Sequence, residues 1–125
     1  MKVNFYTCVN CGNIAVKIVD SGVDLVCCGK PMVKVIANSV EASEDKHLPV
    51  VTIEGDVIDV NIGTIDHPME EDHYITFIYL QTKNGGQRKA LSPGDAPHVS
   101  FRVVDDEAIA VFAHCNTHGI WKTEL

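Results

Sequence analysis

The sequence is organised around one short stretch near its end, Cys115-Asn116-Thr117-His118-Gly119-Ile120-Trp121. A cysteine thiolate and a histidine imidazole separated by two residues on a loop can both reach one metal ion. Two ligands do not complete a site, so the other donors have to come from elsewhere in the chain. The alternative is a small buried cysteine beside a surface imidazole, and the rest of the sequence has to decide between the two.

Four of the five cysteines lie within the first 36 residues, as a C-x-x-C pair and an adjacent pair. A C-x-x-C followed by glycine forms a tight knuckle whose backbone amides can point at sulfur, and a second pair closes a tetrahedral four-thiolate cage. A fragment this short buries too little apolar surface to fold alone, so a metal that crosslinks it is expected. The predicted ligands of this first centre are Cys8, Cys11, Cys27 and Cys28.

The composition changes after Ile36, where a polar segment without cysteine begins. We therefore predict two domains, a small one at 1–36 and a larger one at 37–125. Within the small domain, residues 15–19 and 23–26 are predicted to be short strands joined by a turn.

The larger domain is predicted to consist of short strands. The segments 57–62 and 98–103 alternate between apolar and polar residues, so each has one buried face. Residues 74–80 are mostly apolar on both faces, as in a central strand, and 108–113 is another buried run. Six or seven strands separated by turns indicate an all-β fold, in which an immunoglobulin-like β-sandwich follows the small metal-binding domain. The residues predicted to point inward are Ile58, Val60, Ile62, Val99, Phe101 and Val103.

Composition and charge narrow the class of protein. The chain has 125 residues, 46% of them apolar and 22% charged, which is ordinary for a globular protein. It has no run near the ~18 apolar residues of a membrane span and no apolar signal region, so a cytoplasmic location is expected. Cysteines in that reducing compartment serve as metal ligands more often than as disulfides. A net charge of −7 argues against nucleic acid and anionic membranes as partners, and an anionic substrate would need a local positive guide.

Three polar stretches carry histidines that could turn toward one ion. They are 45–49 at the entry to the sandwich, 67–73 before the central strand, and 115–118 after the last strand. Each of these histidines lies at the edge of a strand, so metal ligation would require no rearrangement of the core. By contrast, His98 alternates with the inward residues of its strand, and strand geometry turns His114 to the side opposite the neighbouring cysteine.

These stretches resemble the motifs of a known family. His67-Pro-Met-Glu-Glu-x-His73, Lys46-His47-x-Pro49 and Cys115-Asn-x-His118-Gly-x-Trp121 are similar to motifs of superoxide reductases. The adjacent cysteine pair resembles desulforedoxin, a small electron-transfer module whose iron is held by four cysteines. Spacing alone does not separate iron from zinc in such a cage. Over essentially its whole length, the chain resembles desulfoferrodoxin, the two-iron form of superoxide reductase.

The resemblance implies two iron centres, one with four cysteine ligands and one with four histidine ligands and one cysteine ligand. In the second, the histidines would surround a ferrous ion in an equatorial plane, with an axial thiolate and an open position opposite it. Neutral imidazoles suit ferrous iron, and an axial thiolate pushes electron density toward a bound oxygen species. The implied reaction is one-electron reduction of superoxide to hydrogen peroxide by a homodimer, with an external donor such as rubredoxin. The implied ligands are His47, His67, His73, His118 and Cys115.

The resemblance also places the catalytic lysine at Lys46, beside the ligand His47. A lysine here would steer the superoxide anion and stabilise negative charge that develops during the reaction; the alternative is a solvated surface lysine. The family usually carries glutamate immediately before this lysine, where it can bind the ferric ion. Here the position is occupied by Asp45, one methylene shorter, with Glu44 beside it.

Two other classes of function compete with the enzyme. One is an electron carrier in which both metals only shuttle electrons, and the other is a module that zinc stabilises. Zinc is usually satisfied by four ligands, so a set of five donors disfavours it. Lys46 and the incomplete octahedron disfavour a pure carrier. A visible spectrum would separate the metals, because zinc–thiolate centres are colourless and ferric–thiolate centres absorb strongly.

Overall fold

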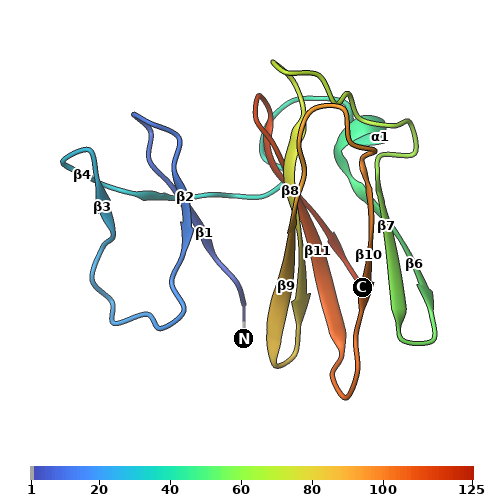
Figure 1. Ribbon diagram of the computed structural model, residues 1–125. Coiled ribbons are helices and arrows are strands. Elements are labelled where there is room, and N and C mark those ends of the chain that lie inside the picture. The colour runs from blue at the N-terminus through green and yellow to red at the C-terminus, as the bar shows by residue number, and fades with distance from the viewer. Residues whose placement is uncertain (1) are drawn as a thin grey trace. The chain divides into compact units, whose positions relative to one another are not determined.

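The structure is a computed structural model that describes residues 2–125, almost all of them in strands, turns and loops (Figure 1). The chain forms two compact units, the first ending at Ile36 and the second spanning Ala37–Leu125. Across the described residues, no helix has the length and apolar character that crossing a membrane requires.

Very short strands make up the first unit. A three-stranded antiparallel sheet has the order β2-β1-β5, and β3 pairs with β4 in a separate hairpin. Phe5 and Cys8 are the only buried side chains among residues 2–36, so burial of apolar surface contributes little to the stability of this unit. The strands are β1 (Phe5–Thr7), β2 (Ile14–Val16), β3 (Val26–Cys27), β4 (Lys30–Pro31) and β5 (Val33–Lys34).

The predicted hairpin within residues 15–26 is wrong, because β2 and β3 are shorter than expected and do not pair with each other. Side-chain hydrogen bonds hold the intervening segment as a loop: Lys17 Nζ donates to Asp20 Oδ1 at 3.1 Å and to the Val23 carbonyl at 2.8 Å. Ile18 is 88% exposed. An aliphatic run forms a strand only where a neighbouring surface buries one of its faces, and none does so here.

The second unit is a sandwich of two antiparallel sheets, which confirms the predicted all-β class. One sheet has the order β10-β7-β6 and the other β12-β11-β8-β9. A single helical turn, α1, precedes the first strand. The elements are α1 (Glu44–His47), β6 (Pro49–Glu54), β7 (Val57–Ile62), β8 (Ile75–Thr82), β9 (Gly85–Ala90), β10 (His98–Arg102), β11 (Ala108–Cys115) and β12 (Gly119–Glu124).

The core lies between the two sheets and contains inward-pointing residues that the alternating pattern predicted. β7 and β10 each bury one face, and the central strand β8 is hydrogen-bonded to both β9 and β11. The one predicted inward residue outside these strands, Val103, is partly buried against the same core. The core residues from the four strands include Ile58, Val60, Ile62, Ile75, Ile78, Leu80, Val99, Phe101, Val111, Ala113 and Cys115.

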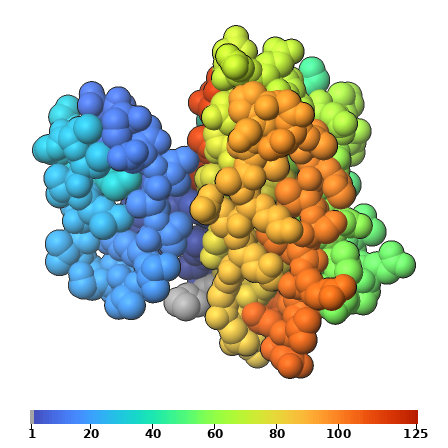
Figure 2. All heavy atoms as spheres, viewed as in Figure 1, coloured from blue at the N-terminus to red at the C-terminus, as the bar shows by residue number. Residues whose placement is uncertain are grey.

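Side chains close both open sides of the sandwich. On one side, Gln87 and Lys89 of β9 donate hydrogen bonds of 2.8 and 2.5 Å to carbonyl groups of β10. The atoms of these two edges form one continuous surface in the space-filling view, coloured gold to orange (Figure 2). On the other side, Thr123 Oγ1 donates a 2.7 Å bond to the carbonyl of Pro49. These bonds occupy edge carbonyls that would otherwise be open to pairing with another chain.

The packing predicts a large difference between two isoleucines. Ile78 is fully buried on β8, whereas Ile53 on β6 is 54% exposed. Ile78→Ala should lower the free energy of unfolding by roughly 2–5 kcal/mol, because it leaves a cavity in the core. Ile53→Ala should change it by no more than about 0.5 kcal/mol. Urea unfolding followed by Trp121 fluorescence reports on the second unit alone, since the chain has one tryptophan; equal losses would contradict the packing described here.

Candidate metal centres

The four cysteines of the first unit converge on one point. Their sulfur atoms all lie within 4.8 Å of one another, and Cys27 Sγ is 3.6 Å from Cys11 Sγ and 4.0 Å from Cys28 Sγ. Four sulfurs held tetrahedrally about 2.3 Å from one ion would be about 3.8 Å apart. The spacing of these thiols therefore fits a shared tetrahedral metal ion.

The backbone explains how adjacent cysteines can both face this cluster. Neighbouring side chains of an extended strand point to opposite sides. Cys27 ends strand β3, but Cys28 has a φ of 53°, in the left-handed region that non-glycine residues rarely adopt. This conformation breaks the alternation, and Gly29 continues the turn with a φ of 74°. Both sulfurs consequently reach the cluster.

Two thiols of the first centre have pKa values shifted in opposite directions. Backbone amides of Cys11 and Asn10 stabilise the Cys8 thiolate and lower its pKa to about 6. In contrast, hydrogen bonds to the sulfurs of Cys11 and Cys8 raise the pKa of Cys27 to about 12. The Cys27 thiol therefore keeps its proton at neutral pH. A bound metal ion would replace that proton and neutralise the remaining thiolates.

Four imidazoles in the second unit form a closed ring. His47 ends α1, His67 follows β7, His73 precedes β8, and His118 lies in the turn between β11 and β12. Going round the ring from His47 through His67, His73 and His118, neighbouring centroids are 4.7, 4.8, 5.2 and 4.9 Å apart, with interplanar angles of 73–89°. Rings that stand edge-on to one another in this way can direct their nitrogen atoms at a common centre.

The ring nitrogens and one sulfur meet at that centre. His47 Nε2 lies 3.2 Å from both His67 Nε2 and His118 Nδ1, whereas two nitrogens bound at right angles about 2.1 Å from one ion would be about 3.0 Å apart. His73 Nε2 is buried and has no hydrogen-bond partner among the described residues. The Cys115 sulfur lies 3.7 Å from His118 Nδ1. An unpartnered buried nitrogen beside three others and a sulfur fits a metal ligand set.

Backbone carbonyls determine which nitrogen of two histidines faces the centre. His47 Nδ1 is 2.6 Å from the Ser43 carbonyl, and His67 Nδ1 is 2.7 Å from the Pro68 carbonyl. A carbonyl can only accept a hydrogen bond, so each Nδ1 carries the proton and each Nε2 keeps its lone pair for a metal.

Cys115 is a fully buried residue whose thiol nevertheless ionises easily. Burial opposes its ionisation, but the polar groups around the sulfur, among them the Thr117 hydroxyl and backbone amide, outweigh burial and lower its pKa to about 4. Thr117 Oγ1 lies 3.4 Å from the sulfur. The residue is therefore a thiolate at neutral pH, which is the form that binds metal.

Two residues that the sequence analysis quoted without a role support the ligands. Trp121 stacks on His47 with centroids 4.9 Å apart, and its Nε1 donates a 3.1 Å bond to the His118 carbonyl. Asn116 accepts a 3.0 Å bond from the Tyr74 amide through Oδ1 and donates a 3.0 Å bond to a carbonyl in the loop before β8 through Nδ2. In the sequence, the only sign that Trp121 and Asn116 support the ligands was their closeness to Cys115 and His118.

The remaining candidates are not among the atoms that converge on the two centres. Lys46 and Asp45 are exposed on α1, directly before the buried His47. His98 is exposed and 3.8 Å from a carboxylate of β7. His114 stacks on the ring of Phe77 and forms a 2.6 Å hydrogen bond with the Thr76 hydroxyl, on the face of β11 opposite the sulfur.

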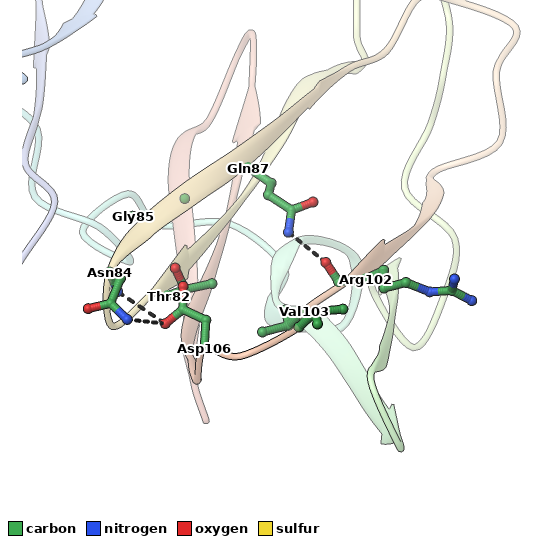
Figure 3. Close-up of a pocket in the computed structure, with 9 residues that line it drawn as sticks. Thr82, Asn84, Gly85, Gln87, Arg102, Val103 and Asp106 are labelled. Carbon is green, nitrogen blue, oxygen red and sulfur yellow. Dashed lines mark hydrogen bonds between the residues drawn. The ribbon is translucent and has the colours of Figure 1, made fainter.

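A shallow hollow of about 440 Å³ lies at the opposite end of β8 (Figure 3). An eight-residue strand spans about 25 Å, so the hollow is remote from the histidine ring. Its polar groups bind one another: Asn84 is hydrogen-bonded to Asp106, and Gln87 to the carbonyl of Arg102. The Arg102 side chain points away from it (Figure 3). None of the donor atoms lines this hollow.

The fold and the two donor sets define a two-centre metalloprotein, with a four-thiolate module followed by a β-sandwich that holds four histidines and a cysteine. The family model described as Desulfoferrodoxin matches residues 39–124. A second family model, described as the N-terminal domain of desulfoferrodoxin, matches residues 1–35. The chain belongs to the desulfoferrodoxin family, as its motifs predict. The two donor clusters fit the two iron centres expected of that family.

Relatives and solved structures agree with this assignment. Desulfoferrodoxin from Syntrophotalea carbinolica is 41% identical over 123 residues, covering 98% of this chain and 97% of the relative. A desulfoferrodoxin homolog from Archaeoglobus fulgidus is 41% identical over 119 residues, covering 94% of each. The superoxide reductase from Treponema pallidum superposes with a TM-score of 0.83 at 30% identity, covering 99% of this chain and all of the other. The one-iron superoxide reductase from Giardia intestinalis has a TM-score of 0.55 at 36% identity, covering 65% of this chain and 99% of the other.

The two centres should be separable by mutation. Cys28→Ser removes one of four thiolates from the first centre, so we expect one iron per chain instead of two, with the second unit still folded. Cys115→Ser should leave the first centre intact and abolish the thiolate-to-iron absorption band of the second. Elemental analysis, visible spectra and Trp121 fluorescence would measure these outcomes, and each variant is the control for the other. Two irons with unchanged spectra in either variant would contradict the ligand set.

Trp121 should affect metal affinity through the groups that it holds. Trp121→Phe retains an aromatic ring against His47 but loses the hydrogen bond to the His118 carbonyl. We expect the affinity of the second centre for iron to fall about ten-fold, the lower end of the usual effect of removing a group that orients a ligand. Competition with a chelator, followed by the absorption of each centre, would measure it. The first centre is an internal control, and equal iron release from both centres would contradict the expectation.

Proposed function

We propose that this chain is a superoxide reductase that converts superoxide into hydrogen peroxide. The observation that carries the proposal is the ring of four imidazoles beside a buried thiolate. Superoxide gains one electron and two protons to become hydrogen peroxide, and an external donor restores the electron. The solved structures from Treponema pallidum and Giardia intestinalis are named superoxide reductases.

The donor set suits iron better than zinc, because zinc is usually satisfied by four ligands. A ferrous ion bound by these five donors would supply the electron for the reaction, and the soft thiolate of Cys115 would increase its electron density. The protein holds His47 and His67 in their metal-binding tautomers in advance, through hydrogen bonds to backbone carbonyls. It also holds Cys115 ionised at neutral pH. Little reorganisation of the ligands is therefore needed when the metal binds or changes its charge.

Lys46 guides the substrate in this proposal. Superoxide is an anion, and the chain carries a net charge of −7. Residues 37–125 include fifteen of the seventeen acidic side chains but only six of the ten basic ones, and Lys46 is the only lysine or arginine between residues 37 and 82. Its ammonium group is therefore the positive charge nearest in sequence to His47. This charge attracts the superoxide anion locally.

Asp45 completes the proposed substrate region. It occupies the place where the family usually carries glutamate, and it is exposed beside Lys46. Because both residues face solvent, protons for the product can be drawn from water at this surface. The proposed site residues are Lys46 and Asp45 for the reaction, Cys8, Cys11, Cys27 and Cys28 for the first centre, and His47, His67, His73, His118 and Cys115 for the second.

The finer features of the protein are also proposals. The unit at 1–36 would be a desulforedoxin-like domain and the unit at 37–125 the superoxide reductase domain. The electron donor would be a small redox protein such as rubredoxin, and the protein would act in the cytoplasm as a homodimer. Exposed aliphatic residues of the first unit support association, since Ile18, Val19 and Val23 present apolar surface to solvent.

The ratio of product to substrate tests the function directly. A reductase yields one hydrogen peroxide for each superoxide consumed, whereas dismutation yields one for every two. We expect the first ratio when a donor keeps the protein reduced. An electron carrier without a substrate site would consume no more superoxide molecules than the number of electrons that it had stored.

Lys46→Ala should slow the second-order reaction with superoxide roughly ten-fold, because one steering charge is lost. Both irons should stay bound, since lysine is not among the ligands. The ratio of the wild-type rate to the variant rate should shrink as salt rises, because charge is screened over about 10 Å at 0.1 M. Pulse radiolysis across a salt series would measure it. Lys83→Ala, an exposed lysine after the far end of β8, is the control; equal rates in the wild type and Lys46→Ala would reduce Lys46 to a surface charge.

A further inference from the structure

The helical turn that carries the substrate region cannot support itself. α1 has four residues, and its N-cap, Ser43, makes no side-chain capping bond. A single turn fixes several backbone angles for very few hydrogen bonds, so it is unstable in isolation. Yet this turn presents Asp45, Lys46 and His47 in sequence. Something outside α1 must therefore hold its backbone in place.

The turn that follows β7 provides that support, and we call residues 63–65 the clamp. The Gly63 amide donates a 3.1 Å bond to the carbonyl of Leu48, and the Ile65 amide donates a 3.0 Å bond to the carbonyl of Asp45. Thr64 Oγ1 donates a further bond of 3.3 Å to the Asp45 carbonyl. The bonded carbonyls lie on either side of residues 46 and 47.

Only glycine allows the two backbones to approach this closely. Gly63 is buried and has a φ of 85°. A Cβ atom at this position would lie 2.3 Å from the Ile65 carbonyl oxygen, 2.6 Å from the Asp45 carbonyl oxygen and 2.8 Å from the Lys46 Cα. Two of these three atoms belong to α1. A side chain at position 63 would therefore have to displace the backbone on which Lys46 is mounted.

Lys46 and its neighbour His47 depend on the clamp to different degrees. The His47 ring is also held by the Ser43 carbonyl and by stacking on Trp121. By contrast, the Lys46 ammonium has no hydrogen bond or ion pair among the residues that the structure describes. Only the backbone of Lys46 therefore limits where its ammonium group can reach.

We propose that Gly63, with Thr64, is a positioning residue for Lys46. By holding α1 against the end of β7, the clamp sets the place from which the ammonium group guides superoxide to the iron. The inference about catalysis rests on the proposed function, whereas the support of α1 by the clamp does not. The clamp also begins the loop that leads to the ligand His67, whose amide donates a 3.1 Å bond to the Ile62 carbonyl. The same short turn therefore contacts the backbone that carries Lys46 and leads to the ligand His67.

Gly63→Ala tests the proposal, and Gly55→Ala is its matched control. The two glycines occupy turns at opposite ends of β7, and both have positive φ values, but a Cβ at Gly55 would have no atom within 4 Å. Backbone strain is therefore common to both variants, and displacement of α1 is specific to Gly63→Ala. Thr64→Val removes one hydrogen bond to Asp45 at nearly constant volume and provides a milder second variant.

In the iron-loaded full-length protein, we expect Gly63→Ala to keep two irons and the thiolate absorption band. Amide hydrogen exchange in the peptide spanning residues 43–48 should accelerate in Gly63→Ala, less in Thr64→Val, and not in Gly55→Ala. The rate with superoxide should fall roughly three- to ten-fold in Gly63→Ala, because small misplacements of a guiding group are costly. The double variant Gly63→Ala/Lys46→Ala should react no more slowly than Lys46→Ala.

Several results would overturn the proposal. Unchanged exchange in the 43–48 peptide of both clamp variants would show that the clamp does not hold α1. Equal effects of Gly63→Ala and Gly55→Ala would assign the change to backbone strain. A further loss of rate when Gly63→Ala is added to Lys46→Ala, or loss of iron in Thr64→Val, would show that the clamp acts through the ligands. If the protein formed no peroxide, the proposed function would fail, and the exchange data would still decide whether the clamp holds α1.

Discussion

The dominant constraint in this molecule is that five donor atoms from three separate chain segments must meet at one point. His47 enters before β6, His67 and His73 border the loop between β7 and β8, and Cys115 and His118 flank the turn after β11. Cys115 ends strand β11, but the four histidines lie in loops or single turns, which could not hold them alone. Their ends are fixed by strands whose inward side chains are fully buried, so the packed sandwich converts loop residues into a preorganised ligand set.

The two units meet a similar chemical demand by different physical means. In the second unit, the core holds the strands, and hydrogen bonds to carbonyls orient the imidazoles before a metal binds. In the first unit, short strands and two buried side chains supply little packing, so the crowded thiols and their metal must supply much of the stability. The unusual backbone of Cys28 illustrates this dependence, since its left-handed conformation serves the convergence of sulfurs rather than any packing contact.

Rigid and adaptable parts also lie side by side near the second centre. The ligands are held through their side chains by Ser43, Pro68, Trp121 and one another, whereas Lys46 is held only through its backbone. Because the backbone of α1 is held while the Lys46 ammonium is free to move, the ammonium can follow an incoming anion and the metal site stays unchanged. The clamp at residues 63–65 holds the backbone of α1, because Gly63 lets the turn after β7 contact that backbone closely.

Much of this architecture follows from the residue pattern alone. Strict alternation in 57–62 and 98–103 predicted two core-facing strands, and the apolar run at 74–80 predicted the central one, because burial on one or both faces leaves a local periodic signal. The motifs around the histidines and cysteines predicted the family and its donor set. The sequence could not predict β9, which is polar and exists because its backbone pairs with β8, nor the loop at residues 17–25, where side-chain bonds replaced the expected hairpin. It also left Trp121, Asn116 and Gly63 without roles. Those roles arise from contacts between segments far apart in the chain, such as Gly63 against α1, and only the tertiary structure brings such segments together.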